Sequence, residues 1–299
     1  MATTAQKPVR VLAAPRETRR EPRRGSPHRA GRVLLYVVLT ALGVIAALPF
    51  VWMILSSFKP EAEVRAIPPT FWPQHASLDN YRTIFRDPEL PLMLFYRNSA
   101  FVAIMNTLAT LFTGSILGYI FAKFQFRLRT PLFWFILATM MIPEQVTMLP
   151  GYLILLQLHL LNNLWGLIIP SFIDAFAIFV MRQFIISIPN DEIWSARVDG
   201  ASEWRIYRSI VLPQLLAPLA TLGLLTFMFN WNAYLWPLIV LTEQNKRTLP
   251  IILTWYSTQH SSQENLVMAA SVLIVIPVLI VFALSQKWIV RGLTLTGGR

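Results

Sequence analysis

Polar side chains interrupt the long apolar runs of this 299-residue chain at a small number of positions. A polar group at membrane depth finds no partner in lipid, so it is a functional candidate by default. Amides and carboxylates match the hydroxyl groups of a polyhydroxylated solute, and an indole ring offers a flat face for stacking. The residues of these types that we expect to line a solute pathway are Asn106, Glu144, Gln145, Asp174, Asn230, Trp231 and Asn232.

Several of these positions, and their neighbours, also fit a structural role. Tyr234 and Trp236 fit an interfacial aromatic belt or helix packing. Glu144 fits a hydrogen bond between helices, and Asp174 fits a position near the outer surface. The residues alone leave these alternatives open.

Residues 189–213 form a polar segment between two apolar runs. Pro189 ends the incoming helix, and acidic residues follow at once, where the dipole of a new helix favours them. Asp199-Gly200 is a turn signal, and a second short helix is expected near Ser202. Two short helices joined by a turn make a compact projection into the cytoplasm.

The side chains of this projection fit a docking role, and an amphipathic loop that lies on the bilayer is the alternative. Ala196 and Ala201 are small enough to let another surface approach closely. Trp204 and Tyr207 are apolar anchors of the kind that interfaces use. We therefore interpret residues 189–213 as a docking element for a cytoplasmic partner, with Pro213 at the entry to the next apolar run.

The sequence argues against several kinds of chemistry. It contains no Cys, which excludes disulfides, thiolate catalysis and Cys-ligated metals. The four His residues are scattered through the tail and loops and indicate no metal site. No G-x-x-x-x-G-K-[ST] loop is present, so the chain is not expected to hydrolyse ATP. We predict no catalytic residue, no metal and no cofactor bound by this chain.

The composition is that of a membrane protein. Apolar residues make up 55% of the chain and charged residues 14%, against roughly 45–50% and about 25% in soluble domains. Six apolar runs approach or exceed the roughly 20 residues that a helix needs to cross the hydrocarbon core. We predict an all-α polytopic membrane protein with spans at about 33–55, 98–122, 131–156, 165–186, 211–241 and 266–286. The third, fourth and fifth runs carry Pro or a charge, which membrane helices tolerate when neighbours satisfy the backbone.

The basic residues predict the orientation. Nineteen of the 26 Lys and Arg residues fall on the side of the two termini and seven on the other, so the positive-inside rule places both termini in the cytoplasm. The tail 1–32 holds nine of them and reads as a disordered arm on the anionic membrane surface. We expect no nucleic-acid partner, and residues 33–299 form the transmembrane domain.

Five segments, in order, carry a resemblance to a known family. The segment 194–201 resembles the signature loop of ATP-binding-cassette (ABC) importer permeases, with Gly200 as its glycine. The chain is similar to the binding-protein-dependent permeases of carbohydrate importers, of the maltose-transporter inner-membrane class, and its six spans resemble the smaller permease subunit. The segments that match are Asn98-Ser99, 141–146, 194–202 with Ile210-Val211-Leu212-Pro213, 231–238 with 247–250, and 286–294.

The resemblance implies a type I ABC importer permease fold with a cytoplasmic coupling helix. It implies a second permease subunit in a heterodimer, two ABC ATPase subunits that bind ATP and Mg, an extracytoplasmic solute-binding protein, and membrane lipid. It places the chain in the inner or plasma membrane of a prokaryote. The residues that it assigns to coupling with the ATPase are Ser195, Ala196, Arg197, Asp199, Gly200, Ala201, Glu203 and Trp204.

The chain departs from the signature at its start. Trp194 stands where the signature has Glu, and Ser195 stands where it has Ala, which puts the local contact with the ATPase in doubt. The cargo is expected to be a sugar or oligosaccharide. The alternatives are a glycerol phosphate or sugar phosphate carried by the same machine, a membrane-embedded enzyme and a secondary transporter. Cationic residues at membrane depth would favour the phosphate, and none is present there.

Overall fold

The computed structural model describes residues 29–88, 90–258 and 263–296, and within these ranges it contains helices and no strand. The longer helices are α1 (Arg29–Ser57), α4 (Leu92–Lys123), α5 (Arg129–Thr139), α6 (Glu144–Gln157), α8 (Ala175–Ile186), α12 (Leu216–Trp231) and α15 (Glu264–Thr296). The shorter helices are α2 (Glu61–Val64), α3 (Asp79–Arg86), α7 (Trp165–Ile168), α9 (Asn190–Val198), α10 (Glu203–Ile206), α11 (Leu212–Gln214), α13 (Leu235–Val240) and α14 (Ile251–Thr258). Two 3-10 helices, η1 (Ile169–Phe172) and η3 (Gln244–Lys246), and a π-helix, η2 (Tyr207–Val211), complete the chain.

The chain divides into two units, residues 1–49 and 50–299, and Pro49 at the boundary lies inside α1. In the first unit, the apolar side chains of α1 are exposed on every face of the helix. A helix that is apolar all round and unburied by protein is typical of a lipid-facing span. The predicted tail 1–32 lies almost wholly outside the described residues.

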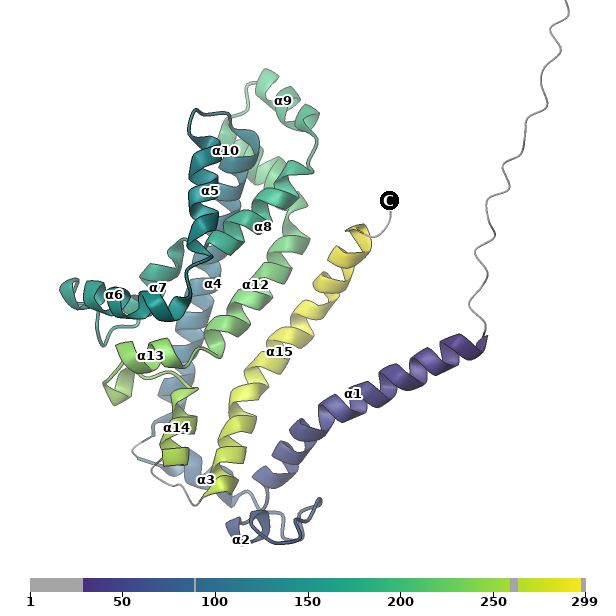
Figure 1. Cartoon of the computed structure of the whole chain (residues 1–299), viewed down its shortest axis with the longest axis vertical. Coiled ribbons are helices and arrows are strands. Elements are labelled where there is room, and N and C mark those ends of the chain that lie inside the picture. Colours follow the sequence, from purple (N-terminus) through teal and green to yellow (C-terminus); the bar gives the residue numbers. More distant parts are fainter. Residues whose placement is uncertain (1–28, 89, 259–262, 297–299) are drawn as a thin grey trace, which may run out of the picture. The chain divides into compact units, whose positions relative to one another are not determined.

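Three of the six predicted spans lie in single long helices. The runs 33–55, 98–122 and 266–286 lie in α1, α4 and α15, and each helix extends beyond the run at both ends. Each of these helices is long and apolar enough to cross a membrane. Within the second unit, α12 lies between α4 and α15, with α8 packed on α4 (Figure 1).

The other three predicted spans are broken. Pro143 adopts an extended conformation, and α5 and α6 meet there at 98°. Asp174 is likewise extended, and the helices on its two sides bend by 40°. The run 211–241 is interrupted at Leu215, where the chain bends by 77°, and again between α12 and α13. Proline explains the first break because it lacks the N–H that would continue the helix.

Two glycines let α4 and α8 approach closely. Gly114 and Gly118 are four residues apart and therefore share a face of α4. A Cβ added at Gly114 would lie 2.8 Å from the Cβ of Ala177, and one at Gly118 would lie 2.8 Å from the Cβ of Met181. This is the small-residue spacing by which membrane helices bring their backbones together.

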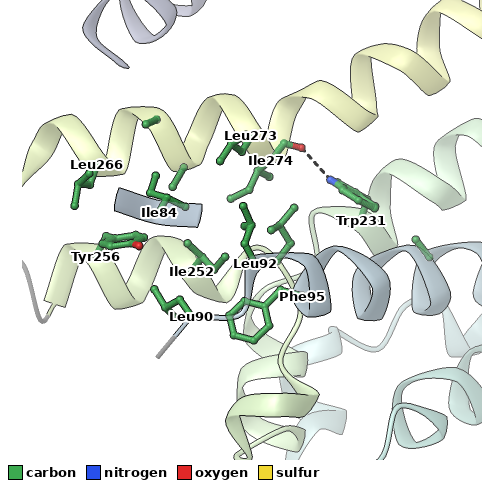
Figure 2. Close-up of a cluster of buried hydrophobic side chains, with 14 residues drawn as sticks. Ile84, Leu90, Leu92, Phe95, Trp231, Ile252, Tyr256, Leu266, Leu273 and Ile274 are labelled. Carbon is green, nitrogen blue, oxygen red and sulfur yellow. Dashed lines mark hydrogen bonds between the residues drawn. The ribbon is translucent and has the colours of Figure 1, made fainter. Parts of the chain in front are cut away.

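A proline in α15 is compensated by side chains of neighbouring helices. Pro277 has no N–H to offer the carbonyl of Leu273, and the hydroxyl of Tyr96 donates to that carbonyl instead. One residue further on, the indole Nε1 of Trp231 donates to the carbonyl of Ile274 at 3.0 Å (Figure 2). The largest buried cluster joins α3, α14, α15 and the start of α4 around these bonds.

The loop after α1 is held by hydrogen bonds of two buried charged side chains, Lys59 and Glu63. The Nζ of Lys59 donates to the carbonyl of Thr70, and Glu63 accepts bonds from the Thr70 hydroxyl at 2.9 Å and the Gln74 amide at 2.8 Å. The Gln74 bond does most to hold the pKa of the Glu63 carboxyl below its usual range, and bonds from Thr70 and the His75 amide add to it against the effect of burial. The loop is therefore an ordered structure with an ionised carboxylate at its centre.

We expect Gly118→Ala to destabilise the protein although Ala is the better helix former. Its Cβ would meet the Cβ of Met181 and the backbone of Arg182, and overpacking costs about 1–3 kcal/mol. The matched control is Gly43→Ala, because nothing lies within 4 Å of a Cβ there. Thermal unfolding in detergent should show a lower Tm for Gly118→Ala only, and equal Tm values would contradict the close α4–α8 contact.

Acid should loosen the loop 66–78. A carboxyl whose folded pKa is depressed contributes stability above its unfolded pKa of about 4.3, and this stability is lost as the pH falls through the folded pKa. Hydrogen exchange at the Gln74 and His75 amides, corrected for intrinsic rates, should therefore stay slow at pH 7 and rise below about pH 4. Glu63→Gln, which loses one acceptor oxygen, should exchange faster at pH 7. Equal exchange in both proteins at pH 7 would refute the role of Glu63.

Candidate functional site

Five of the seven predicted pathway residues line one cavity of about 500 Å³. The cavity is bounded by α4, α6, α12 and α13, and Trp236, Tyr234 and Thr248 also contribute to its wall. The five predicted residues that line it are Asn106, Glu144, Gln145, Asn230 and Asn232. Residues separated by more than one hundred positions in the sequence are thus brought to one volume.

The breaks in the apolar runs position these residues. Pro143 turns the chain so that Glu144 and Gln145 form the first turn of α6. The end of α12 places Asn232 at its C-cap, where the side-chain amide donates to the carbonyl of Met228 at 2.9 Å. A continuous helix at either place would not direct these polar groups to a common cavity.

Two asparagines join α4 to α12 at the cavity wall. The Asn106 side chain is 1% exposed, and its Nδ2 donates to the Oδ1 of Asn230 at 2.6 Å. The Nδ2 of Asn230 donates in turn to the carbonyl of Thr226 at 2.9 Å. The Oδ1 of Asn106 is buried and has no hydrogen-bond partner.

Trp231 and Asp174 lie away from this cavity. Trp231 is 2% exposed and faces α15, where it bonds the carbonyl near Pro277 (Figure 2). The side chain of Asp174 caps α8 by accepting the Ala177 amide at 2.6 Å. Asp174 lines a second cavity of about 560 Å³, which shares Ser171, Phe229 and Asn230 with the first.

The walls of the two cavities contain acidic residues and no basic ones. Glu144 lines the first cavity and Asp174 the second, and neither wall includes a Lys or Arg. The remaining polar groups are amides and hydroxyls, and Trp236 adds an aromatic ring. Such a wall suits a neutral ligand rich in hydroxyl groups.

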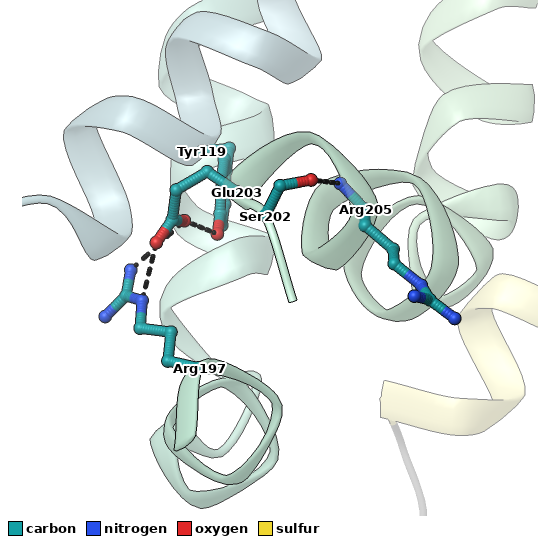
Figure 3. A network of polar contacts seen from close by, with 5 residues as sticks. All are labelled: Tyr119, Arg197, Ser202, Glu203 and Arg205. Atoms are coloured by element: carbon teal, nitrogen blue, oxygen red, sulfur yellow. Dashed lines mark hydrogen bonds and ion pairs between the residues drawn. The ribbon is translucent and has the colours of Figure 1, made fainter. Parts of the chain in front are cut away.

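The segment 189–213 folds as two short helices around a turn. α9 ends at Val198, and Gly200 adopts a positive φ of 79°, which a residue with a Cβ rarely takes. The Ser202 hydroxyl then caps α10 by accepting the amide of Arg205 (Figure 3). α10, η2 and α11 continue to Gln214, so Pro213 lies two residues before the bend at Leu215 that leads into α12.

An ion pair within this segment is anchored to α4. The Nε of Arg197 donates to the Oε1 of Glu203 at 2.7 Å, and a second guanidinium nitrogen donates to Oε2 at 3.2 Å. The hydroxyl of Tyr119, a buried residue of α4, donates to the same Oε2 at 2.8 Å (Figure 3). We call these three residues the α4 clamp.

Two further residues of α4 hold the segment. The Nζ of Lys123 donates to the Ile188 carbonyl at 2.6 Å and to the Oδ1 of Asn190 at 2.8 Å. The hydroxyls of Ser115 and Tyr207 lie 2.7 Å apart and share a hydrogen bond. Sequence reasoning did not single out Ser115, Tyr119 or Lys123, although their spacing of four residues would have placed them on one helix face.

The predicted coupling residues divide between an inner and an outer face of this segment. Ala196 and Ala201 are half-buried and pack on the cluster that includes Tyr207. Tyr207 is 5% exposed, so the expectation that it anchors an external partner is wrong: its ring packs inside the chain. The outer face carries exposed residues of the segment, which are Trp194, Ser195, Val198, Asp199, Gly200 and Trp204.

The outer face is notably apolar for a polar loop. Val198 is 87% exposed, and Trp194 and Trp204 are each 57% exposed.

Within the part of the chain that the structure describes, no group of three or more His, Asp or Glu side chains is arranged to hold a metal ion.

Comparison with known proteins finds similarity to subunits of membrane transport systems. The family described as "Binding-protein-dependent transport system inner membrane component" matches residues 114–295. The chain is 32% identical to the arabinooligosaccharides transport system permease protein AraQ of Halalkalibacterium halodurans, over 88% of this chain and 95% of that protein. It is 32% identical to the sn-glycerol-3-phosphate transport system permease protein UgpE of Salmonella typhi, over 89% of this chain and 97% of that protein.

A solved structure shares the fold. It is a bacterial ABC transporter involved in the import of the acidic polysaccharide alginate. One of its chains superimposes with a TM-score of 0.76 at 26% identity, and the match covers 88% of this chain and 98% of that one.

Proposed function

The chain belongs to the family of binding-protein-dependent transport system inner membrane components, and on that premise we propose that it is the permease subunit of an ATP-driven importer of sugars or oligosaccharides. It is an inner-membrane transport subunit with the type I ABC importer permease fold. In this proposal it forms half of the translocation pathway. ATP and Mg are bound and hydrolysed on partner subunits.

One observation carries the proposal: an apolar, ordered projection is fixed to the helix that also borders the cavity. Val198, Trp194 and Trp204 expose apolar surface on a segment outside the apolar runs. Tryptophan is enriched among the residues that contribute most to binding at protein interfaces. We assign this outer face to one of two ABC ATPase subunits. Of the residues expected to couple to the ATPase, the ones that lie on this face are Ser195, Asp199, Gly200 and Trp204.

A movement of segment 189–213 can reach the cavity because both contact α4. α4 carries Asn106 at the cavity and Tyr119 at the clamp, thirteen residues further along the same rigid element. Closure of the ATPases would pull on the projection and, through α4 and α8, change the cavity walls. Such coupling requires two states that are biased by ligands on both sides. Alternating access of this kind is the mechanism that we propose.

The remaining partners follow from the same assignment. A second permease subunit would complete the pathway as a heterodimer, and an extracytoplasmic binding protein would deliver the solute. Both termini and residues 189–213 would face the cytoplasm, and lipid would surround the apolar outer surface. No role is assigned to nucleic acid.

Glycerol phosphate is the second candidate cargo. The identity to UgpE equals that to AraQ, so similarity does not separate the two. The walls of both cavities contain carboxylates and no Lys or Arg, and a phosphate is usually met by cationic groups. The cavities therefore favour the neutral sugar.

The docking face is tested by charge insertion. Val198→Glu and Trp204→Glu place a carboxylate on exposed positions, so folding should be preserved while apolar contact with the ATPase is lost. Copurification of the ATPase subunits from membranes should fall at least about tenfold, as expected for hot-spot residues that contribute about 1.4 kcal/mol or more. Trp72→Glu, at an exposed tryptophan of the loop after α1, is the control and should copurify normally. Full copurification with both loop variants would reject this assignment.

The α4 clamp is tested by two conservative substitutions. Glu203→Gln removes the charge that Arg197 pairs with, and Tyr119→Phe removes one donor. Because the ion pair is about one-third exposed, each should cost only about 1 kcal/mol of stability, yet both should reduce solute uptake more than ATPase copurification. The measurement is uptake per assembled complex in proteoliposomes. Proportional losses of uptake and assembly would show that the clamp acts in docking alone.

A further inference from the structure

The wall of the first cavity includes two residues with buried polar atoms that the protein leaves unsatisfied. Among the described residues, five buried side-chain atoms lack a hydrogen-bond partner, and two of them belong to residues of the cavity wall: the Oδ1 of Asn106 and the Oγ1 of Thr248. Leaving such an atom unpaired costs about 1–3 kcal/mol. Native structures keep few of them, and each calls for a physical explanation.

The local hydrogen bonds leave Asn106 no internal donor. Its Nδ2 is engaged by Asn230 and lies 3.4 Å from the carbonyl of Leu167. Exchanging the amide O and N would direct an oxygen at both of these acceptors, so the amide orientation is determined. The free Oδ1 therefore needs a donor from outside the chain.

The position of Thr248 is set by the same helix. The Leu249 amide donates to the hydroxyl of Ser99 at 2.7 Å, and Asn98 donates to the Arg247 carbonyl at 3.0 Å. Thr248 is therefore held near the Asn98-Ser99 level of α4, and Asn106 lies seven residues from Ser99, about 10 Å along the helix. The two unsatisfied groups therefore belong to the same cavity wall but lie at different heights along α4.

A hydroxylated ligand matches this wall. A hydroxyl group can donate to the Asn106 carbonyl and can accept from or donate to the Thr248 hydroxyl. A phosphate dianion has no proton to donate to Asn106, and the wall contains no Lys or Arg to balance its charge. The volume of about 500 Å³ lies in the range of small-ligand pockets, about 300–1,000 Å³.

We propose that this chain itself binds the solute, at a subsite in which Asn106 and Thr248 hydrogen-bond hydroxyl groups of a neutral saccharide. The subsite rests on the proposed importer function and adds to it a direct role in recognition. Trp236 and Tyr234 supply ring surface in the same wall, and the absence of Lys and Arg from this wall disfavours anionic solutes. Selection by the delivering protein is thus followed by a second selection in the membrane.

The test uses the assembled importer in proteoliposomes. Arabinotriose, lactose and sn-glycerol 3-phosphate are the probes. Each is supplied with its loaded binding protein at saturating concentration, so that the affinity of the binding protein does not affect the measured uptake. Thr248→Val is the main variant: the Oγ1 has no partner in the chain, so its removal should not lower the Tm. Asn106→Leu is the second variant, and Thr107→Val, on α4 outside both cavity walls, is the matched control.

Thr248→Val should reduce the uptake of the transported sugar about 3- to 10-fold, the effect of losing one hydrogen bond of about 1 kcal/mol, with unchanged assembly and Tm. Thr107→Val should transport like the parent protein, and sn-glycerol 3-phosphate should not be carried. Unchanged uptake in an assembled Thr248→Val complex would overturn the subsite, whatever the folding of Asn106→Leu. Uptake of the phosphate ester in preference to both sugars would overturn the neutral class. Failure of the parent chain to copurify with an ATPase would instead refute the proposed function.

Discussion

The close contact between α4 and α8 is the constraint on which the other features depend. Gly114 and Gly118 have no Cβ, so the two helix backbones approach until their neighbours are in van der Waals contact. α8 leads directly into residues 189–213, and α4 carries the Tyr119 and Lys123 side chains that hold this segment. A wider spacing would move the clamp beyond hydrogen-bond distance, because donor and acceptor must lie within about 3.2 Å.

Breaks in the helices position residues of the two cavities. In lipid, a break leaves backbone groups unsatisfied unless they line a cavity or are buried in protein. The breaks at Pro143 and after Trp231 both border the first cavity, and the break at Asp174 borders the second. Proline is also tolerated in α15, because Tyr96 and Trp231 bond the carbonyls near it. Polar side chains at membrane depth thus divide into those that repair helices and those that face a cavity.

Much of this architecture can be read from the residues. The length of the apolar runs predicts α1, α4 and α15, since a helix must cover about 30 Å of hydrocarbon. The turn at Gly200 and the cap at Ser202 are local features that depend on neighbouring residues only. The rule that polar groups in apolar runs face a cavity holds for six pathway residues, five at the first cavity and Asp174 at the second. It does not hold for Trp231, because hydrogen bonding to α15 near Pro277 depends on a helix more than thirty residues away.

The sequence by itself determined that this protein is a helical membrane protein. It also determined the longest helices and the short helices around Gly200. These features follow from hydropathy, proline, glycine and helix capping, which act over a few neighbouring residues. Only the tertiary structure decided which polar groups meet. It joined Asn106 to Asn230 and Glu203 to Tyr119, placed Tyr207 inside and Trp204 outside, and left Asn106 and Thr248 with unsatisfied atoms beside the cavity. The reason is that contacts between distant residues depend on how helices pack, and packing here is set by where two glycines allow backbones to meet.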